Sequence, residues 1–253
     1  NNITFVDSAD VRLHSSAATA GDLFINASTD LAVGGNLSIT ATTGNITQGG
    51  ALNVVGATTL VTTSQAATID LTTTTNSFTG ELLITTNDNN TPADATYAAH
   101  ASIDGGTTNL IIGTSTIDGN LTLLSGGTIT DTVGSSVTVK GDLTATTDAN
   151  NSDITLDSLE VGGAYILDPH GTGIVTIVNA AGIDFVAMTV DGALSATATT
   201  GNITQSGALT ITGTTTLITS ADNATITLND AGNAFSGKLL ITTNDTGSET
   251  DGD

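Results

Sequence analysis

Short stretches of alternating apolar and polar residues run through most of the chain. Leu37-Ser38-Ile39, Leu52-Asn53-Val54, Ile69-Asp70-Leu71, Val137-Thr138-Val139 and Leu209-Thr210-Ile211 all have the order apolar, polar, apolar. Successive side chains of a β-strand point to opposite faces, so each stretch can bury one face and leave Thr, Ser or Asn on the other. Glycine and asparagine separate the stretches and permit tight corners. No window has a sustained 3.6-residue period with caps, so the pattern predicts an all-β protein with almost no helix.

The strand pattern is organised into internal repeats. Residues 33–88 align without a gap with residues 190–245, and well over half of the aligned positions are identical. A third, more divergent copy begins with Asp118-Gly119-Asn120-Leu121. Repetition at this scale is typical of folds in which each unit stacks on its neighbours.

These copies predict one continuous solenoid over residues 1–253. Its repeat modules are expected at about residues 36–90, 120–160 and 193–247, with loop insertions near residues 87–101 and 165–175. A sandwich or meander of antiparallel hairpins is an alternative, because Asp-Gly pairs such as Asp104-Gly105 can form hairpin turns. Short strands, near-identical repeats and a core of small aliphatic residues favour a parallel β-helix instead.

Charge and composition exclude several functional classes. Lys plus Arg number 3 and Asp plus Glu number 25, which gives a formal net charge of -22. Such a surface repels phosphate backbones, so we expect no nucleic-acid partner. Cysteine is absent, which excludes disulfides and thiolate chemistry. No run of about 18 apolar residues predicts a transmembrane segment.

Two repeated phrases resemble those of very large secreted bacterial proteins, the filamentous-haemagglutinin-like adhesins and the related "beta strand repeat" surface proteins. The first phrase is residues 201–217, beginning Gly-Asn-Ile-Thr-Gln, and the second is residues 224–237. The resemblance implies a right-handed parallel β-helix in an extracellular, rod-like, structural or adhesive protein on the bacterial cell surface. It implies no particular ligand.

Calcium is the metal best suited to the acidic loops. Asp88, Asp94, Asp245, Glu249, Asp251 and Asp253 lie in stretches rich in Asn, Thr and Gly. Carboxylate and carbonyl oxygens are the ligands of Ca²⁺, so these residues form a weak candidate calcium site. The alternative is a set of solvated acidic loops that keep a cation-poor rod soluble. No other cofactor is expected.

No catalytic constellation is apparent. His14, His100 and His170 have no metal-binding spacing, and the segment Asp168-Pro169-His170-Gly171 is the most unusual local sequence. Only three Glu residues occur, so the paired carboxylates of a glycosidase are not predicted. We therefore expect a protein that is not an enzyme.

The expected function is mechanical. A stiff rod would stack end to end into a fibre, because an open solenoid end exposes backbone donors and acceptors. Two alternatives remain. The first is an ice-binding solenoid, because Thr-x-Thr stretches such as Thr128-Ile129-Thr130 can order water. Residues 87–101 could instead bind cell-surface glycans as the loop of a carbohydrate-binding solenoid.

Overall fold

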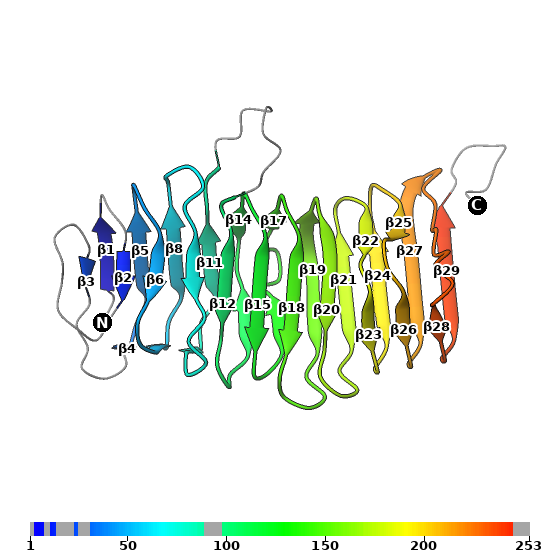
Figure 1. Cartoon of the computed structure of the whole chain (residues 1–253), viewed down its shortest axis with the longest axis horizontal. Coiled ribbons are helices and arrows are strands. Elements are labelled where there is room, and N and C mark those ends of the chain that lie inside the picture. Colours follow the sequence, from blue (N-terminus) through cyan, green and yellow to red (C-terminus); the bar gives the residue numbers. More distant parts are fainter. Residues whose placement is uncertain (1–2, 8–10, 14–22, 25–30, 89–97, 245–253) are drawn as a thin grey trace.

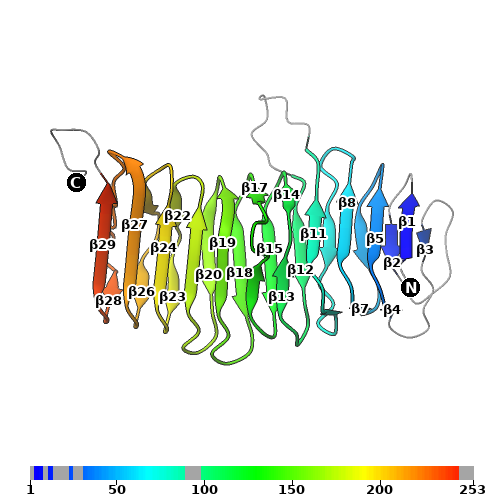
Figure 2. The same cartoon turned by 180° about the vertical axis from the view of Figure 1, so that it is seen from behind.

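The computed structural model describes residues 3–7, 11–13, 23–24, 31–88 and 98–244. In these residues the chain winds into one elongated stack of parallel β-coils, about 10 turns in all, with no helix (Figure 1). The prediction of an all-β parallel solenoid is confirmed. The stack runs from the first strands at one end to β29 (Leu239–Asn244) at the other, and the view from behind shows the same order (Figure 2). The described part of the chain has no helix that could cross a membrane.

Two large sheets run along the stack, and two short sheets each cover only a few of its coils. The largest has 13 strands: β1 (Ile3–Asp7), β5 (Leu37–Ala41), β8 (Thr58–Thr62), β11 (Leu82–Thr85), β13 (Leu110–Ile112), β14 (Ser115–Ile117), β16 (Ile129–Asp131), β17 (Val137–Val139), β19 (Ile154–Val161), β21 (Val175–Asn179), β24 (Leu194–Ala198), β27 (Thr215–Asp222) and β29. The second has 10 strands: β2 (Val11–Leu13), β3 (Leu23–Phe24), β6 (Ile46–Gln48), β9 (Ile69–Leu71), β12 (Ala101–Asp104), β15 (Leu121–Ser125), β18 (Leu143–Thr147), β20 (Ala164–Asp168), β22 (Ile183–Phe185) and β25 (Ile203–Gln205). Two sheets of three strands complete the coils: β4 (Leu31–Val33), β7 (Leu52–Val54) and β10 (Ser77–Phe78), and then β23 (Met188–Val190), β26 (Leu209–Ile211) and β28 (Ala234–Phe235).

The strand register stacks like positions on top of one another. In the first copy, Leu37 pairs with Thr58, which pairs with Leu82. In the second copy, Leu194 pairs with Thr215, which pairs with Leu239. Each copy therefore has a shorter coil followed by a longer one. Insertions between strands alter the length of a coil without breaking the ladder, which is why the sequence period is uneven.

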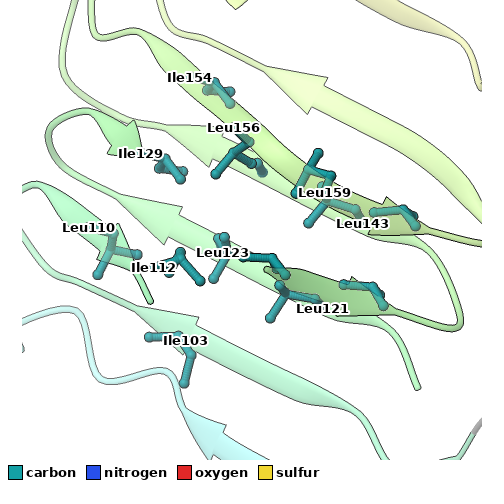
Figure 3. Packing of buried hydrophobic residues seen from close by; sticks show 14 of the residues in the cluster. Ile103, Leu110, Ile112, Leu121, Leu123, Ile129, Leu143, Ile154, Leu156 and Leu159 are labelled. Carbon is teal, nitrogen blue, oxygen red and sulfur yellow. The ribbon is translucent and has the colours of Figure 1, made fainter. Parts of the chain in front are cut away.

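The core is a narrow column of aliphatic side chains. The alternating residues that the sequence pattern placed inside are buried, and Leu37, Ile39, Leu60, Ile84 and Ile177 are 0% exposed. Figure 3 shows the middle of this column stacked from coil to coil. Each buried residue packs mainly on the coils above and below, so small aliphatic residues fill the space and large aromatic residues are rarely needed.

Residues 165–175 differ from the expected loop insertion. Their first part belongs to β20, which pairs with β18 and β22, and Tyr165 and Leu167 are 0% exposed. Tyr165 contacts Phe185 of the next coil, with ring centroids 6.3 Å apart. The local sequence departs from the repeat because two aromatic rings fill the core here. Of the other expected insertion, residues 89–97 lie outside the described part of the chain.

One corner shape recurs three times. Thr62, Thr147 and Thr219 each end a buried strand segment, and each hydroxyl donates to the backbone carbonyl five residues later, at 3.3, 3.2 and 3.4 Å respectively. The residue that precedes each acceptor carbonyl has a positive φ, which is 58° at Ala66, 63° at Asn151 and 59° at Asn223. Asparagine tolerates this left-handed conformation, whereas alanine is strained in it.

The change Ala66→Gly should therefore stabilise the protein by about 1 kcal/mol, because glycine removes the clash of the Cβ atom at positive φ. The matched control Ala57→Gly, at a residue without positive φ, should lower stability slightly, since it only adds freedom to the unfolded chain. Chemical denaturation of the three proteins checks both signs. A loss of stability in Ala66→Gly would contradict the strain at this corner.

Two equivalent threonines face the core without a hydrogen bond. Thr58 and Thr215 are 0% and 1% exposed, and neither Oγ1 atom has a partner. A buried hydroxyl without a partner is unfavourable, because it loses its hydrogen bonds to water on folding.

Thr58→Val and Thr215→Val should each raise the free energy of unfolding by about 1 kcal/mol, since valine has nearly the same shape and no hydroxyl. Thr59→Val, which changes the neighbouring half-buried residue, is the control and should have a smaller effect. Thermal unfolding monitored by circular dichroism measures the difference. Destabilisation by Thr58→Val would show that its hydroxyl is satisfied.

Candidate functional site

Side-chain oxygens at the corners bind the backbone of the following coil. The Oδ1 atom of Asn120 accepts a hydrogen bond from the N–H of Asp142 at 2.9 Å, and Oδ1 of Asp142 accepts one from the N–H of Ala164 at 2.8 Å. The same contact recurs at Asn36–Ala57, Asn45–Thr68, Asn109–Thr128, Asn151–Thr172, Asp153–Ile174 and Asn202–Thr225. In all of these contacts, the acceptor belongs to the earlier coil and the donor to the later one.

Glycine makes these contacts sterically possible. A Cβ atom on Gly141 would lie 2.0 Å from Oδ1 of Asn120, and one on Gly163 would lie 2.4 Å from Oδ1 of Asp142. Gly141 thus accommodates the Asn120 side chain of the preceding coil, while the adjacent Asp142 reaches the next coil. The Gly-Asn and Gly-Asp pairs, which the sequence identified only as corners, therefore connect successive coils.

A paired-amide contact joins Gln48 to Asn76, which is 2% exposed. The Nε2 atom of Gln48 donates to Oδ1 of Asn76 at 2.8 Å, and Nδ2 of Asn76 donates to Oε1 of Gln48 at 2.9 Å. Asn76 also accepts from the N–H of Leu52 and donates to the carbonyl of Asp104 in the following coil, both at 2.9 Å. One amide therefore satisfies groups from three successive coils.

The second copy repeats this contact between Gln205 and Asn233, at 2.9 and 2.7 Å, and Asn233 again accepts from the N–H of the matching leucine, Leu209. The sequence contained a signal for it that the pattern of strands alone did not reveal. In the corner of residues 72–77, aligned with residues 229–234, asparagine is the one residue that is identical in both copies.

The ends of the segment that contains residues 89–97 are held together by polar contacts. Oδ2 of Asp88 accepts from the N–H of Ala98 at 3.1 Å, and the N–H of Asp88 donates to Oδ2 of Asp118 at 3.0 Å. The other carboxylate oxygen of Asp118 forms an ion pair with Nζ of Lys140 at 2.7 Å. Asp88 and Asp118 are 4% and 8% exposed. Thus Asp88, one of the candidate calcium ligands, closes the base of this segment.

The other candidate calcium ligands, Asp94, Asp245, Glu249, Asp251 and Asp253, lie outside the described residues. Within the described part, no group of three or more His, Asp or Glu side chains is placed to hold a metal ion. The calcium site therefore stays a prediction that concerns the remaining carboxylates.

The structure keeps the described histidines apart. Nδ1 of His100 accepts from the N–H of Asn120 at 2.9 Å, and the backbone N–H of His170 donates to Oγ1 of Thr147 at 3.0 Å. The two residues lie on different coils, while His14 is outside the described residues. The segment Asp168-Pro169-His170-Gly171 forms the end of β20 and the corner after it.

The Thr-x-Thr stretches occupy several sheets. Thr128 and Thr130 flank the buried Ile129 at the 13-stranded sheet, Thr144 and Thr146 lie on the 10-stranded sheet, and Thr210 lies on a three-stranded sheet. Their middle residues are buried, so the threonines face outward as the pattern indicated. They do not gather on one flat face.

A half-buried carboxylate stabilises an irregularity in β19. Oδ1 and Oδ2 of Asp131 accept from the N–H groups of Asp157 and Ser158 at 3.2 and 2.8 Å, where the register between β19 and β21 shifts. Burial raises the pKa of Asp131 above its ordinary value of 3.8, and the two backbone donors partly oppose that shift. The ionised form is thus favoured less in the folded protein than in the unfolded chain.

Asn76→Ala should destabilise the protein by about 3 kcal/mol, because it leaves buried groups on three coils without partners. Asn233→Ala removes the same contact near the end of the stack, where its side chain is only half-buried, and should cost about 1 kcal/mol. Chemical denaturation of both variants tests the difference. Equal and small effects would contradict the role of the paired amides.

Asp131 should make the protein's stability depend on pH. A carboxyl with a raised pKa in the folded state contributes stability that is present below its unfolded pKa and is lost as pH rises through its folded pKa. Relative to Asp131→Asn, the wild-type protein should therefore gain stability as pH falls from 7 to 4, by at most about 1 kcal/mol because half of the side chain stays in water. Denaturation at several pH values measures this gap, with Asp148→Asn as an exposed-acid control. A free energy of unfolding of the wild type that falls relative to that of Asp131→Asn as the pH is lowered would refute the sign.

Comparisons with known proteins agree with the repeat architecture. No curated protein and no solved structure matches the chain. A family model described as "Repeats of unknown function (DUF5649)" matches residues 10–85, 98–165 and 172–242. The three matches end at or near β11, β20 and β29, so each spans several coils of the stack. Because they cover well over half of the chain, it belongs to this family of repeats, DUF5649.

Proposed function

We propose that the chain is a structural module of a secreted bacterial fibre or giant surface adhesin, where it acts as a stiff spacer and not as an enzyme. The observation that supports this proposal is the uninterrupted stack of parallel coils. Backbone ladders join successive coils, corner Asn and Asp side chains reinforce many of these junctions, and paired amides reinforce two of them. Bending such a stack would break hydrogen bonds on one side of several coils together.

The charge distribution suits an extracellular rod. With a net charge of -22 and three strong cations, rods repel one another laterally and stay apart in solution. Lys140, one of these cations, is ion-paired with Asp118. At the described end of the stack, β29 exposes Leu239, Leu240 and Ile241, so we propose that association occurs end to end and not side to side.

The resemblance to filamentous-haemagglutinin-like adhesins supports placement at the bacterial cell surface. Adhesion to glycans would require a separate binding element, for which the segment around residues 89–97 is the candidate. The ice-binding alternative is less well supported, because the Thr-x-Thr stretches are divided among several sheets.

Electron microscopy and small-angle X-ray scattering of the purified chain test the proposal. We expect straight rods with the width of one coil, and lengths that increase in steps of one molecule as protein concentration rises. Added salt should promote lateral contacts by screening the negative charge. Compact scattering profiles would contradict the rod, and monomers of a single length at all concentrations would contradict end-to-end association.

A further inference from the structure

The last strand of the stack exposes residues that are buried in its earlier copy. Leu239, Leu240 and Ile241 of β29 are 45%, 51% and 54% exposed. Their counterparts in the first copy include Leu82 and Ile84, which are 0% exposed. β29 forms one end of the described stack (Figure 1). The same strand sequence is therefore covered in one copy and uncovered in the other.

The covering of the first copy comes from residues 98–117. Leu82 of β11 pairs with Ile112, and Thr85 pairs with Thr116. Oγ of Ser115 accepts from the N–H of Ile84 at 3.0 Å. The N–H of Gly113 donates to the carbonyl of Leu82 at 2.7 Å. This segment thus combines apolar cover with backbone pairing.

The same segment also covers the neighbouring face of the coil. Ala101 and Ile103 of β12 pair with Ile69 and Leu71 of β9, whose second-copy counterparts are Ile226 and Leu228. The carbonyl of Asp104 accepts from Nδ2 of Asn76, whose counterpart is Asn233. The first-copy residues that make these contacts, Ile69, Leu71, Asn76 and Leu82, therefore have identical counterparts at the end of the stack.

We propose that the exposed face of β29, with Ile226 and Leu228 beside it, binds a parallel β-coil of the same chemistry as residues 98–117, supplied by another repeat. This inference rests on the proposed function, because it specifies which coil makes the stacking contact. The acceptor strand is identical in the two copies, since Leu82 to Asn87 and Leu239 to Asn244 have the same sequence. The bound coil places an isoleucine over Leu239 and a hydroxyl at the N–H of Ile241.

A synthetic peptide with the sequence of residues 98–117 tests this proposal on the full chain. We expect saturable one-to-one binding by fluorescence anisotropy, together with slower hydrogen exchange of the backbone amides of residues 239–244. A peptide with Ile112→Asp is the control. It should bind at least about tenfold more weakly, because it would bury a charge against Leu239. Equal binding of the two peptides, or no protection of residues 239–244, would overturn the proposal.

Two protein variants on the same strand sharpen the test. Ile241 corresponds to the buried Ile84, whereas Leu240 corresponds to the half-buried Leu83 on the outer side of the strand. Ile241→Asp should abolish peptide binding, and Leu240→Asp should preserve most of it. If Ile241→Asp disorders the last coil, hydrogen exchange of β24 reports this, and the comparison of the two peptides still decides the outcome.

The results also separate this inference from the proposed function. Rods that form while the peptide fails to bind would overturn the inference and leave the structural role intact, with the first strands of a second copy as the alternative partner. Peptide binding without rod formation would support the inference and count against stacking between copies of this chain. Inhibition of rod growth by the peptide, but not by its Ile112→Asp form, would support both.

Discussion

The parallel backbone ladder between successive coils is the interaction on which the structure depends. Each inner coil of the described stack satisfies its N–H and C=O groups with the coils before and after it, so no coil is complete alone. This requirement explains the short strands, because three faces and their corners must fit within a single turn. It also explains why β29, at one end of the described stack, exposes apolar residues whose counterparts inside the stack are buried.

Side chains give the ladder a direction and a register. Asn120 and Asp142 accept hydrogen bonds from the coil that follows, and Gly141 and Gly163 provide the space for those side chains. A ladder of backbone hydrogen bonds alone would permit slippage by two residues, since the pattern of buried and exposed residues repeats every two positions. Corner contacts resist this slippage, because each of them joins one defined residue to another.

The internal duplication places nearly the same sequence at two positions in the stack, so equivalent residues of the two copies can be compared directly. Residues 33–87 are covered by further coils, whereas the closely similar residues 190–244 end the described stack. Asn76 and Asn233, and likewise Leu82 and Leu239, therefore occupy equivalent positions but have different cover. The same substitution made at both members of a pair should change the free energy of unfolding by different amounts. That difference reports how much the neighbouring coil contributes to stability.

The sequence by itself determined the fold class and the inward-facing residues. Alternation at Leu37-Ser38-Ile39 and its equivalents defines one buried face, since side chains in a strand alternate, and the repeats require stacking. It did not determine the partners across coils. Asn76 contacts Gln48 and Asp104, and Asp88 contacts Asp118, only because coils of unequal length bring these residues together. The left-handed corner at Ala66 likewise depended on packing, because alanine by itself disfavours positive φ. The strand at residues 164–168 was missed because its sequence departs from the repeat, although it pairs with the coils on either side.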